Sequence, residues 1–145
     1  MSETTVTTSP APASATPAPR HRRALLALRG VQILLALFFG VASALPKLIA
    51  HPTAVESFDR IGWGAPGMYT IGALELAGAV ALLIPVLQAP AAAALAALMV
   101  GAFITQLTVF DGENAATPVI VFVVLAVIAW VRRGSAAGLV GMVRR

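Results

Sequence analysis

Residues 67–85, GMYTIGALELAGAVALLIP, form an apolar segment that carries a single charged residue, Glu75. A hydrocarbon core of roughly 30 Å requires about 20 helical residues, so this segment is long enough to cross a membrane. A charged side chain near the bilayer centre costs roughly 2 to 4 kcal/mol on insertion scales, and such a residue is by default a functional one. The segment therefore predicts a membrane helix with a candidate site near its middle.

The composition of the whole chain agrees with a membrane protein. Of its 145 residues, 59% are hydrophobic and 11% are charged, whereas soluble domains contain roughly 25% charged residues; the mean hydropathy is +0.89. The chain has no cysteine, which excludes disulfides, thiol relays and cysteine-ligated metal sites. We expect one compact, multi-pass unit in the cell membrane, with the lipid bilayer as its main partner.

Three further apolar segments resemble residues 67–85. Together the four predict an all-α fold, a transmembrane four-helix bundle, with helices at about 30–50, 67–85, 90–110 and 115–133. In the fourth segment, Thr117 is the expected N-cap and Pro118 the expected first helical residue, where proline loses no hydrogen bond. The four helices define one transmembrane domain at 24–133.

Two tails flank the predicted domain. Residues 1–23 are rich in Thr, Ser, Ala and Pro and end in several arginines, so they predict a disordered tail with a basic end. The apolar run that follows also resembles a signal peptide, with Ala42-Ser43-Ala44 as its cleavage site. That run is long for a signal peptide and three more spans follow, so we interpret it as a retained helix. Residues 134–145 predict a short basic cytoplasmic tail.

The distribution of charge predicts the orientation of the bundle. Eight of the ten basic residues precede the first span or follow the fourth, so both termini should face the cytoplasm. An even number of spans also requires that the termini share one side of the membrane. The acidic connections after the first and third spans should then face outward. Because the isoelectric point near 11.2 reflects topology, we expect no nucleic-acid binding.

Polar residues inside the spans gather in the half of the bundle that should face outward. Lys47 lies near the outer end of the first span, and Gln106 lies beside Thr105 near the outer end of the third. Glu75 lies about 13 to 14 Å past Pro66 at 1.5 Å per residue, close to the middle of the membrane. The inner half of the spans is nearly featureless.

Helical spacing predicts where these side chains point. Gly72 and Gly78 lie on the same helical face as Glu75, and small residues allow membrane helices to approach closely. Lys47 shares a face with Ser43 and other small residues. Both charged side chains should therefore point into the bundle.

A proline next to Lys47 should alter the first helix locally. Pro46 removes one helical hydrogen bond, which predicts a kink and a free carbonyl near Ala42. That carbonyl would join the polar cluster of Lys47, Glu75 and Gln106.

Two interpretations of this cluster remain open. In the structural one, Lys47 and Glu75 form a buried ion pair that fixes helix order, and Gln106 completes its hydrogen bonds. In the functional one, they line a pocket open to the outer leaflet, where Lys47 holds an anionic or carbonyl oxygen of a ligand and Glu75 exchanges a proton. The candidate ligand-binding or proton-relay residues are Lys47, Glu75, Gln106, Ser43 and Thr105; no catalytic residue and no metal site can be assigned.

Several motifs resemble the DoxX-like family of small four-helix membrane proteins. They are Phe38-Phe39-Gly40, Leu45-Pro46-Lys47-Leu48, Phe58-Asp59-Arg60-Ile61-Gly62, the stretch from Ile71 to Gly78, and Gly101-Ala102 with Thr105-Gln106. The likeness covers roughly residues 30–130. It implies four transmembrane helices and an association with membrane redox systems, including a subunit of a thiosulfate:quinone oxidoreductase. Where some relatives place histidine near the outer end of the third helix, this chain has Gln106.

The resemblance and the residues together predict a non-catalytic membrane subunit or accessory protein of a redox or stress-response system. The chain's two histidines, His21 and His51, lie outside the spans, so they form no intramembrane haem-ligand pair. We expect no cofactor in the chain itself; a quinone is the candidate ligand, and membrane oxidoreductase subunits are the candidate partners.

Two alternatives belong to other functional classes. A small proton-coupled transporter or channel would use Glu75 as its proton carrier and would need a dimer, because four helices enclose little volume. A structural or assembly protein would need Lys47 and Glu75 for packing alone. The sequence leaves the oligomeric state open.

Overall fold

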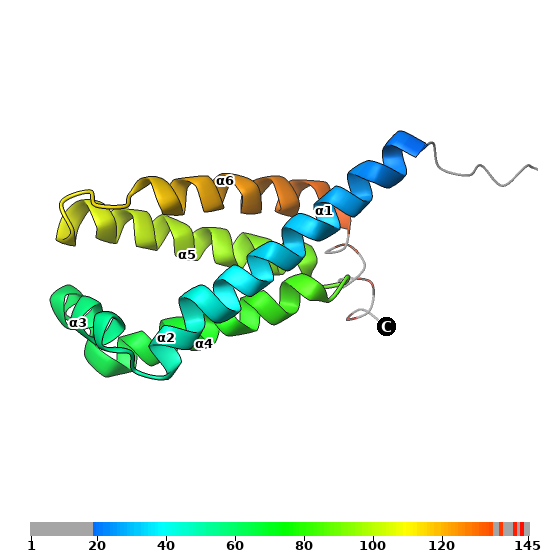
Figure 1. Cartoon of the computed structure of the whole chain (residues 1–145). Helices are drawn as coiled ribbons and strands as arrows, with labels where there is room; N and C mark the ends of the chain where they lie inside the picture. The colour runs from blue at the N-terminus through cyan, green and yellow to red at the C-terminus, as the bar shows by residue number, and fades with distance from the viewer. Residues whose placement is uncertain (1–18, 135–136, 138–140, 142, 144–145) are drawn as a thin grey trace, which may run out of the picture.

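The structure of the chain, a computed structural model, describes residues 19–134 and the single residues 137, 141 and 143. The described part consists of helices joined by short turns and contains no β-strand, which confirms the expected all-α class (Figure 1). The elements in chain order are α1 (Pro19–Leu37), the π-helix η1 (Phe38–Ala44), α2 (Leu45–Leu48), α3 (Pro52–Ile61), α4 (Gly64–Leu83), α5 (Gln88–Val109) and α6 (Ala116–Val131).

Three helical stretches in the described part are long and apolar enough to cross a membrane. They are the continuous stretch from α1 to α2, Pro19–Leu48, and the helices α4 and α5. Helix α6 is also apolar but has only 16 residues. Between 22% and 28% of the most apolar part of each long stretch is buried within the protein. Most of the apolar surface therefore faces outward, as it does in helices solvated by lipid.

Helix α4 occupies the central position in the packing. It contacts α1, η1, α2, α3 and α5, whereas α6 packs mainly on α5. The largest fully buried apolar side chains are Phe39, Met68, Leu82, Leu95, Leu125 and Ile128. Helices α4 and α5 approach closely at Gly78, where a Cβ atom would lie 2.6 Å from the side chain of Leu95. This close approach agrees with the predicted packing face of residues 67–85.

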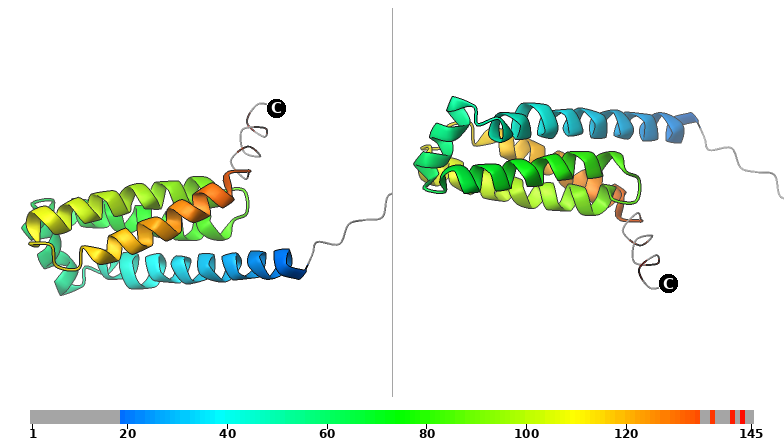
Figure 2. Two further views of the ribbon diagram at one scale, coloured as in Figure 1. Left: turned by 90° about the horizontal axis from the view of Figure 1, so that it is seen from above. Right: turned by 90° about the horizontal axis from the view of Figure 1, so that it is seen from below.

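The two ends of the molecule differ in what they carry. The start of α1 and the end of α6 lie together at one end, here termed the terminal end (Figure 2). Helix α3 and the turn between α5 and α6 lie at the opposite end, termed the α3 end.

The first span is not a uniform α-helix. In η1, the N–H of Leu45 donates to the carbonyl of Gly40, five residues earlier. Pro46 follows directly in the first turn of α2, within the continuous helical stretch, and it has no N–H to donate to an earlier carbonyl. The sequence predicted a kink at this proline, and the structure has a π-helical change of register just before it. Short π-helical insertions in α-helices occur frequently at functional sites.

The connection between the first two spans contains a helix that the sequence analysis did not predict. Helix α3 begins with Pro52 and ends at Gly62, whose φ of 84° is left-handed and favours glycine. Phe58 is buried, while Asp59 and Arg60 are exposed. The helix therefore covers the α3 end with one apolar face.

Some predicted boundaries were wrong by a few residues. Helix α1 begins at Pro19, so the arginines at 20, 22 and 23 are helical and do not belong to a tail that ends at residue 23. The rest of that predicted tail, residues 1–18, lies outside the described residues, as does most of 134–145.

The predicted N-cap of the fourth span was also wrong. Helix α6 begins at Ala116, so Thr117 lies within the first turn. Pro118 still falls among the first four residues, whose N–H groups have no helical partner. Proline is thus tolerated two positions later than expected.

Candidate functional site

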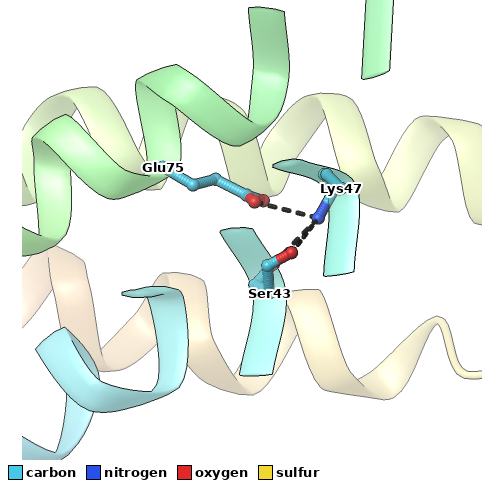
Figure 3. A network of polar contacts seen from close by, with 3 residues as sticks. All are labelled: Ser43, Lys47 and Glu75. Atoms are coloured by element: carbon cyan, nitrogen blue, oxygen red, sulfur yellow. Dashed lines mark hydrogen bonds and ion pairs between the residues drawn. The ribbon is translucent and has the colours of Figure 1, made fainter. Parts of the chain in front are cut away.

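Lys47 and Glu75 form a direct ion pair between α2 and α4 (Figure 3). The Nζ of Lys47 donates to Oε2 of Glu75 over 2.9 Å. Glu75 is 4% exposed. The sequence left open whether these side chains meet, and the structure brings them together.

Gly72, which has no side chain, explains why α2 comes so close to α4. A Cβ atom at Gly72 would lie 3.0 Å from the Cβ of Lys47 and 3.3 Å from the side chain of Leu48. Gly72 precedes Glu75 by three residues, so it lies on the same face of α4. The glycine thus lets the stem of Lys47 cross α4 beside the carboxylate.

Ser43, in η1, completes the environment of the ammonium group. Lys47 Nζ donates to the Ser43 carbonyl over 2.9 Å and to Ser43 Oγ over 3.0 Å. An ammonium group has three donors. With Glu75 Oε2 as the third acceptor, each of the three ammonium protons of Lys47 has a hydrogen-bond partner.

The carboxylate of Glu75 is less fully engaged than its lysine. Oε1 accepts no hydrogen bond from any residue that the structure describes, and it is not among the enclosed polar atoms. Glu75 lines a cavity, so this oxygen is open to it. The pair therefore offers a hydrogen-bond acceptor to the cavity and no unused ammonium donor.

All five residues predicted from the sequence line the same cavity. It has a volume of about 820 Å³, and its wall includes Ser43, Lys47, Glu75, Thr105 and Gln106. We term it the site cavity. Apolar side chains such as Phe38, Leu98 and Val121 form much of the remaining wall.

The two candidate site residues of α5, Thr105 and Gln106, line the site cavity without joining the ion pair. Thr105 Oγ1 donates to the carbonyl of Gly101, within its own helix, over 2.9 Å. Among the described residues, no hydrogen bond links Gln106 to Lys47 or Glu75. The structural interpretation expected Gln106 to complete the hydrogen bonds of the pair; the described contacts do not include that bond, and Gln106 lines the cavity.

A smaller cavity lies on the other side of Lys47. Its volume is about 380 Å³, and five residues line both cavities: Ser43, Lys47, Thr53, Ser57 and Phe58. His51 is exposed and lines the smaller cavity but not the site cavity. The two cavities therefore adjoin one another, and Lys47 belongs to the wall of both.

Helix α3 is attached to α5 across the rim of the site cavity. The guanidinium carbon of Arg60 lies 4.7 Å from the centroid of the Phe110 ring, a distance at which cation–π attraction operates. Both residues line the cavity. The contact between Arg60 and Phe110 therefore forms part of the rim of the site cavity.

Polar residues at the terminal end were missed by the sequence analysis. Gln32 and Gln88 are buried there, with exposed fractions of 0% and 2%. Arg132 donates to Oε1 of Gln32 over 3.5 Å and so links α6 to α1. The prediction that the inner half of the spans is nearly without polar residues was therefore wrong. Glutamine within an apolar run of the sequence could have indicated these buried polar side chains.

A comparison with protein families identifies the chain. The DoxX-like family model matches residues 30–130, a region that includes every residue of the site cavity named above. The chain belongs to the DoxX-like family. No curated protein and no solved structure shows a significant match. As a DoxX-like protein with helices of this length and apolarity, it is an integral membrane protein. Among its described residues, no three metal-ligating side chains come together.

Proposed function

We propose that this DoxX-like protein is a four-helix, multi-pass protein of the cell membrane with both termini in the cytoplasm. The distribution of charge supports this topology. The arginines of α1 and those that directly follow α6 lie at the terminal end, and the exposed acidic residues of α3 and of the turn after α5 lie at the α3 end. Basic residues favour the cytoplasmic side, so the site cavity opens toward the outer leaflet.

Within the membrane, the protein acts as a non-catalytic subunit or accessory protein of a redox or stress-response system and binds a small ligand in the site cavity. The observation that carries this proposal is the Lys47–Glu75 pair in the wall of a cavity of about 820 Å³. Ligand pockets have volumes of roughly 300 to 1,000 Å³ and apolar walls with a few polar groups. A purely structural ion pair would need no adjoining cavity.

The hydrogen-bonding state of the pair favours a ligand that carries a donor. Lys47 has three acceptors already, whereas Glu75 Oε1 has room for a hydroxyl. The amide of Gln106 can donate to or accept from a second oxygen of the same ligand. A quinone offers only acceptors, while its reduced form, a quinol, offers hydroxyl donors. The open acceptor of the Lys47–Glu75 pair therefore fits a quinol, which can donate, better than a quinone.

Native mass spectrometry of the protein in lipid nanodiscs tests the proposal. The wild type is loaded with a ubiquinol-type quinol or with the matching quinone, and Glu75→Gln and Lys47→Met are compared with it. We expect the wild type to retain the quinol more strongly than the quinone. Both variants should lose the quinol, because Glu75→Gln replaces the carboxylate that accepts from the ligand and Lys47→Met removes the ammonium group that holds this carboxylate in place.

Gln88→Leu is the matched control, since Gln88 is also buried but lies at the terminal end. This variant should retain the quinol. Equal loss in the control would mean that general destabilisation explains the result. If neither redox form binds the wild type, the ligand proposal is wrong and the ion pair is structural.

One observation favours a second candidate, a proton-coupled transporter. The smaller cavity reaches Lys47 from the exposed side of His51 and so provides a path toward Glu75. Toward the terminal end, however, fully buried apolar residues such as Phe39, Leu82 and Leu95 fill the interior. Proton flux into liposomes that is lost in Glu75→Gln would favour transport over ligand binding alone.

A further inference from the structure

The wall of the site cavity changes from polar to apolar along the bundle. At the α3 end it carries charged side chains of α3 and of the turn after α5, such as Arg60 and Glu113. Toward the terminal end, beyond Ser43 and Thr105, every lining residue of η1 and α5 is apolar or glycine. We term this part of the cavity the apolar arm; its wall includes Phe38, Ala97, Leu98, Gly101 and Val121.

The apolar arm is too long for a single ring. Ala97 and Gln106 both line the cavity, and their separation on α5 corresponds to about 13 to 14 Å at 1.5 Å per residue. A quinol ring that contacts Glu75 and Gln106 is much shorter than this distance, so it leaves most of the arm empty. A ligand that fills the cavity must extend from the ring into the arm. That extension is a hydrocarbon, because a polar group would lose its hydrogen bonds to water there without replacing them.

The apolar arm lies between the first span and α6, which pack little on one another. Helix α6 packs mainly on α5, and the hydrogen bond from Arg132 to Gln32 joins it to α1 at the terminal end. Phe38 of η1 and Val121 of α6 both line the arm, and Phe38 is 38% exposed. In a bilayer this side of the protein meets acyl chains, so a hydrocarbon in the arm can continue into the lipid.

Gly101 leaves free space in the arm. Gly72 and Gly78 are explained by close helix contacts, but nothing lies within 4 Å of a Cβ atom at Gly101. Glycine weakens the interior of a helix relative to alanine, and no neighbouring side chain or backbone requires it here. Since Gly101 lines the site cavity, a larger side chain would occupy the space of the arm itself.

We propose that the ligand of the site cavity is a chain-bearing amphiphile that enters from the bilayer. Its hydroxylated ring meets Glu75, and its hydrocarbon chain runs past Gly101 and leaves the protein between η1 and α6. This inference rests on the proposed ligand-binding function and narrows its substrate class. A quinol without a chain fills the polar part of the cavity alone.

Two quinols that differ in their chain test this proposal in nanodiscs. One carries a decyl chain and the other a methyl group in its place, and native mass spectrometry measures each titration with the wild type, Gly101→Leu and Gly30→Leu. Gly30 is the matched control, because it has nothing within 4 Å of its Cβ position and lies outside the cavity wall. We expect Gly101→Leu to bind the decyl quinol at least about fivefold more weakly, as overpacking of filled space predicts. It should bind the methyl quinol as the wild type does, and Gly30→Leu should bind both as the wild type does.

A photoreactive chain tests where the ligand leaves the protein. A diazirine midway along the decyl chain should crosslink to η1 or α6 on illumination, and mass spectrometry of the digested protein locates the crosslink. Crosslinks confined to α3 would place the chain at the opposite end of the cavity and would overturn the proposed route.

The titrations separate failure of this inference from failure of the proposed function. Wild-type affinity of Gly101→Leu for the decyl quinol overturns the inference, and so do equal losses of both quinols. In either case, binding of the methyl quinol to the wild type that depends on Glu75 leaves the proposed function standing. If neither quinol binds the wild type, the proposed function fails and the inference fails with it. If Gly101→Leu does not fold, Val121→Phe, at another position in the wall of the arm, must produce the same selective loss for the inference to stand.

Discussion

At the scale of single residues, the Lys47–Glu75 pair predicts an asymmetric response to mutation. Lys47→Met leaves a carboxylate buried without its partner, which we expect to cost about 3 to 5 kcal/mol of stability. The double replacement Lys47→Met, Glu75→Leu should recover most of that loss, because apolar groups of similar volume can replace a buried pair. Thermal unfolding in detergent measures both. A double variant as unstable as the single one would show that the pair itself stabilises the fold.

Gly72 predicts a second effect at this scale. In Gly72→Ala the new Cβ would lie 3.0 Å from that of Lys47, so α2 must move away from α4, and we expect a loss of about 1 to 3 kcal/mol. Gly30→Ala is the matched control, because nothing lies within 4 Å of its Cβ position. The unfolding temperature of Gly30→Ala should be no lower than that of the wild type. Equal unfolding temperatures for the two variants would contradict the role given to Gly72.

Much of the site was predictable from residue types. The small residues around Glu75 and Lys47 indicated inward faces, and the structure places all five candidate residues in one cavity wall. Sequence could not show that Ser43 and Glu75 together saturate Lys47, because that depends on distances of 2.9 to 3.0 Å. The same limit applies to Gln106, whose separation from the pair depends on how α5 is placed.

At the scale of elements, η1 determines where Lys47 points. Deleting Val41, an exposed residue of η1, removes one residue before Lys47, and where the helix does not absorb this loss the following residues rotate by about 100°. We expect Lys47 to leave Glu75 and the unfolding temperature to fall as in Lys47→Met. Val41→Ala, which preserves the register, should leave the unfolding temperature nearly unchanged. A deletion variant as stable as Val41→Ala would exclude this role of the π-helix.

Helix α3 predicts a change in access to the site cavity. Phe110→Leu removes the ring beneath Arg60, and such contacts are worth about 0.5 to 1 kcal/mol at exposed sites, or roughly a two- to fivefold change in an opening equilibrium. Ala102→Cys places the chain's only thiol in the cavity wall. A water-soluble maleimide should label this thiol about two to five times faster when Phe110→Leu is also present. The control Phe122→Leu, on exposed α6 surface, should not alter the rate.

The elements that sequence missed lack a strong hydropathy signal. Helix α3 is short and polar on one face, although Pro52 and Gly62 occupy the positions expected at its start and end. The π-helix is defined by hydrogen bonds to the fifth residue back, such as that from Leu45 to Gly40, which no residue pattern specifies. The long apolar helices, by contrast, were predicted to within a few residues, except for the start of α1.

At the scale of the whole molecule, the proposed topology can be tested with single cysteines. The natural chain has none, so each variant carries one thiol. In intact cells, a membrane-impermeant maleimide should label Glu113→Cys, at the α3 end. Gly134→Cys, at the terminal end, should react only after permeabilisation. The reverse pattern would invert the proposed orientation.

Unequal helix lengths give the molecule two different sides toward the bilayer. The first span has 30 residues, whereas α6 has 16, which corresponds to about 24 Å at 1.5 Å per residue. A hydrocarbon layer of roughly 30 Å must thin beside α6 or be met there by a neighbouring protein, and either adjustment costs fractions of a kcal/mol per Å of mismatch. Neighbours with similarly short spans relieve that deformation when they approach along α6. Membrane elasticity alone therefore gives this protein a preferred side for lateral association.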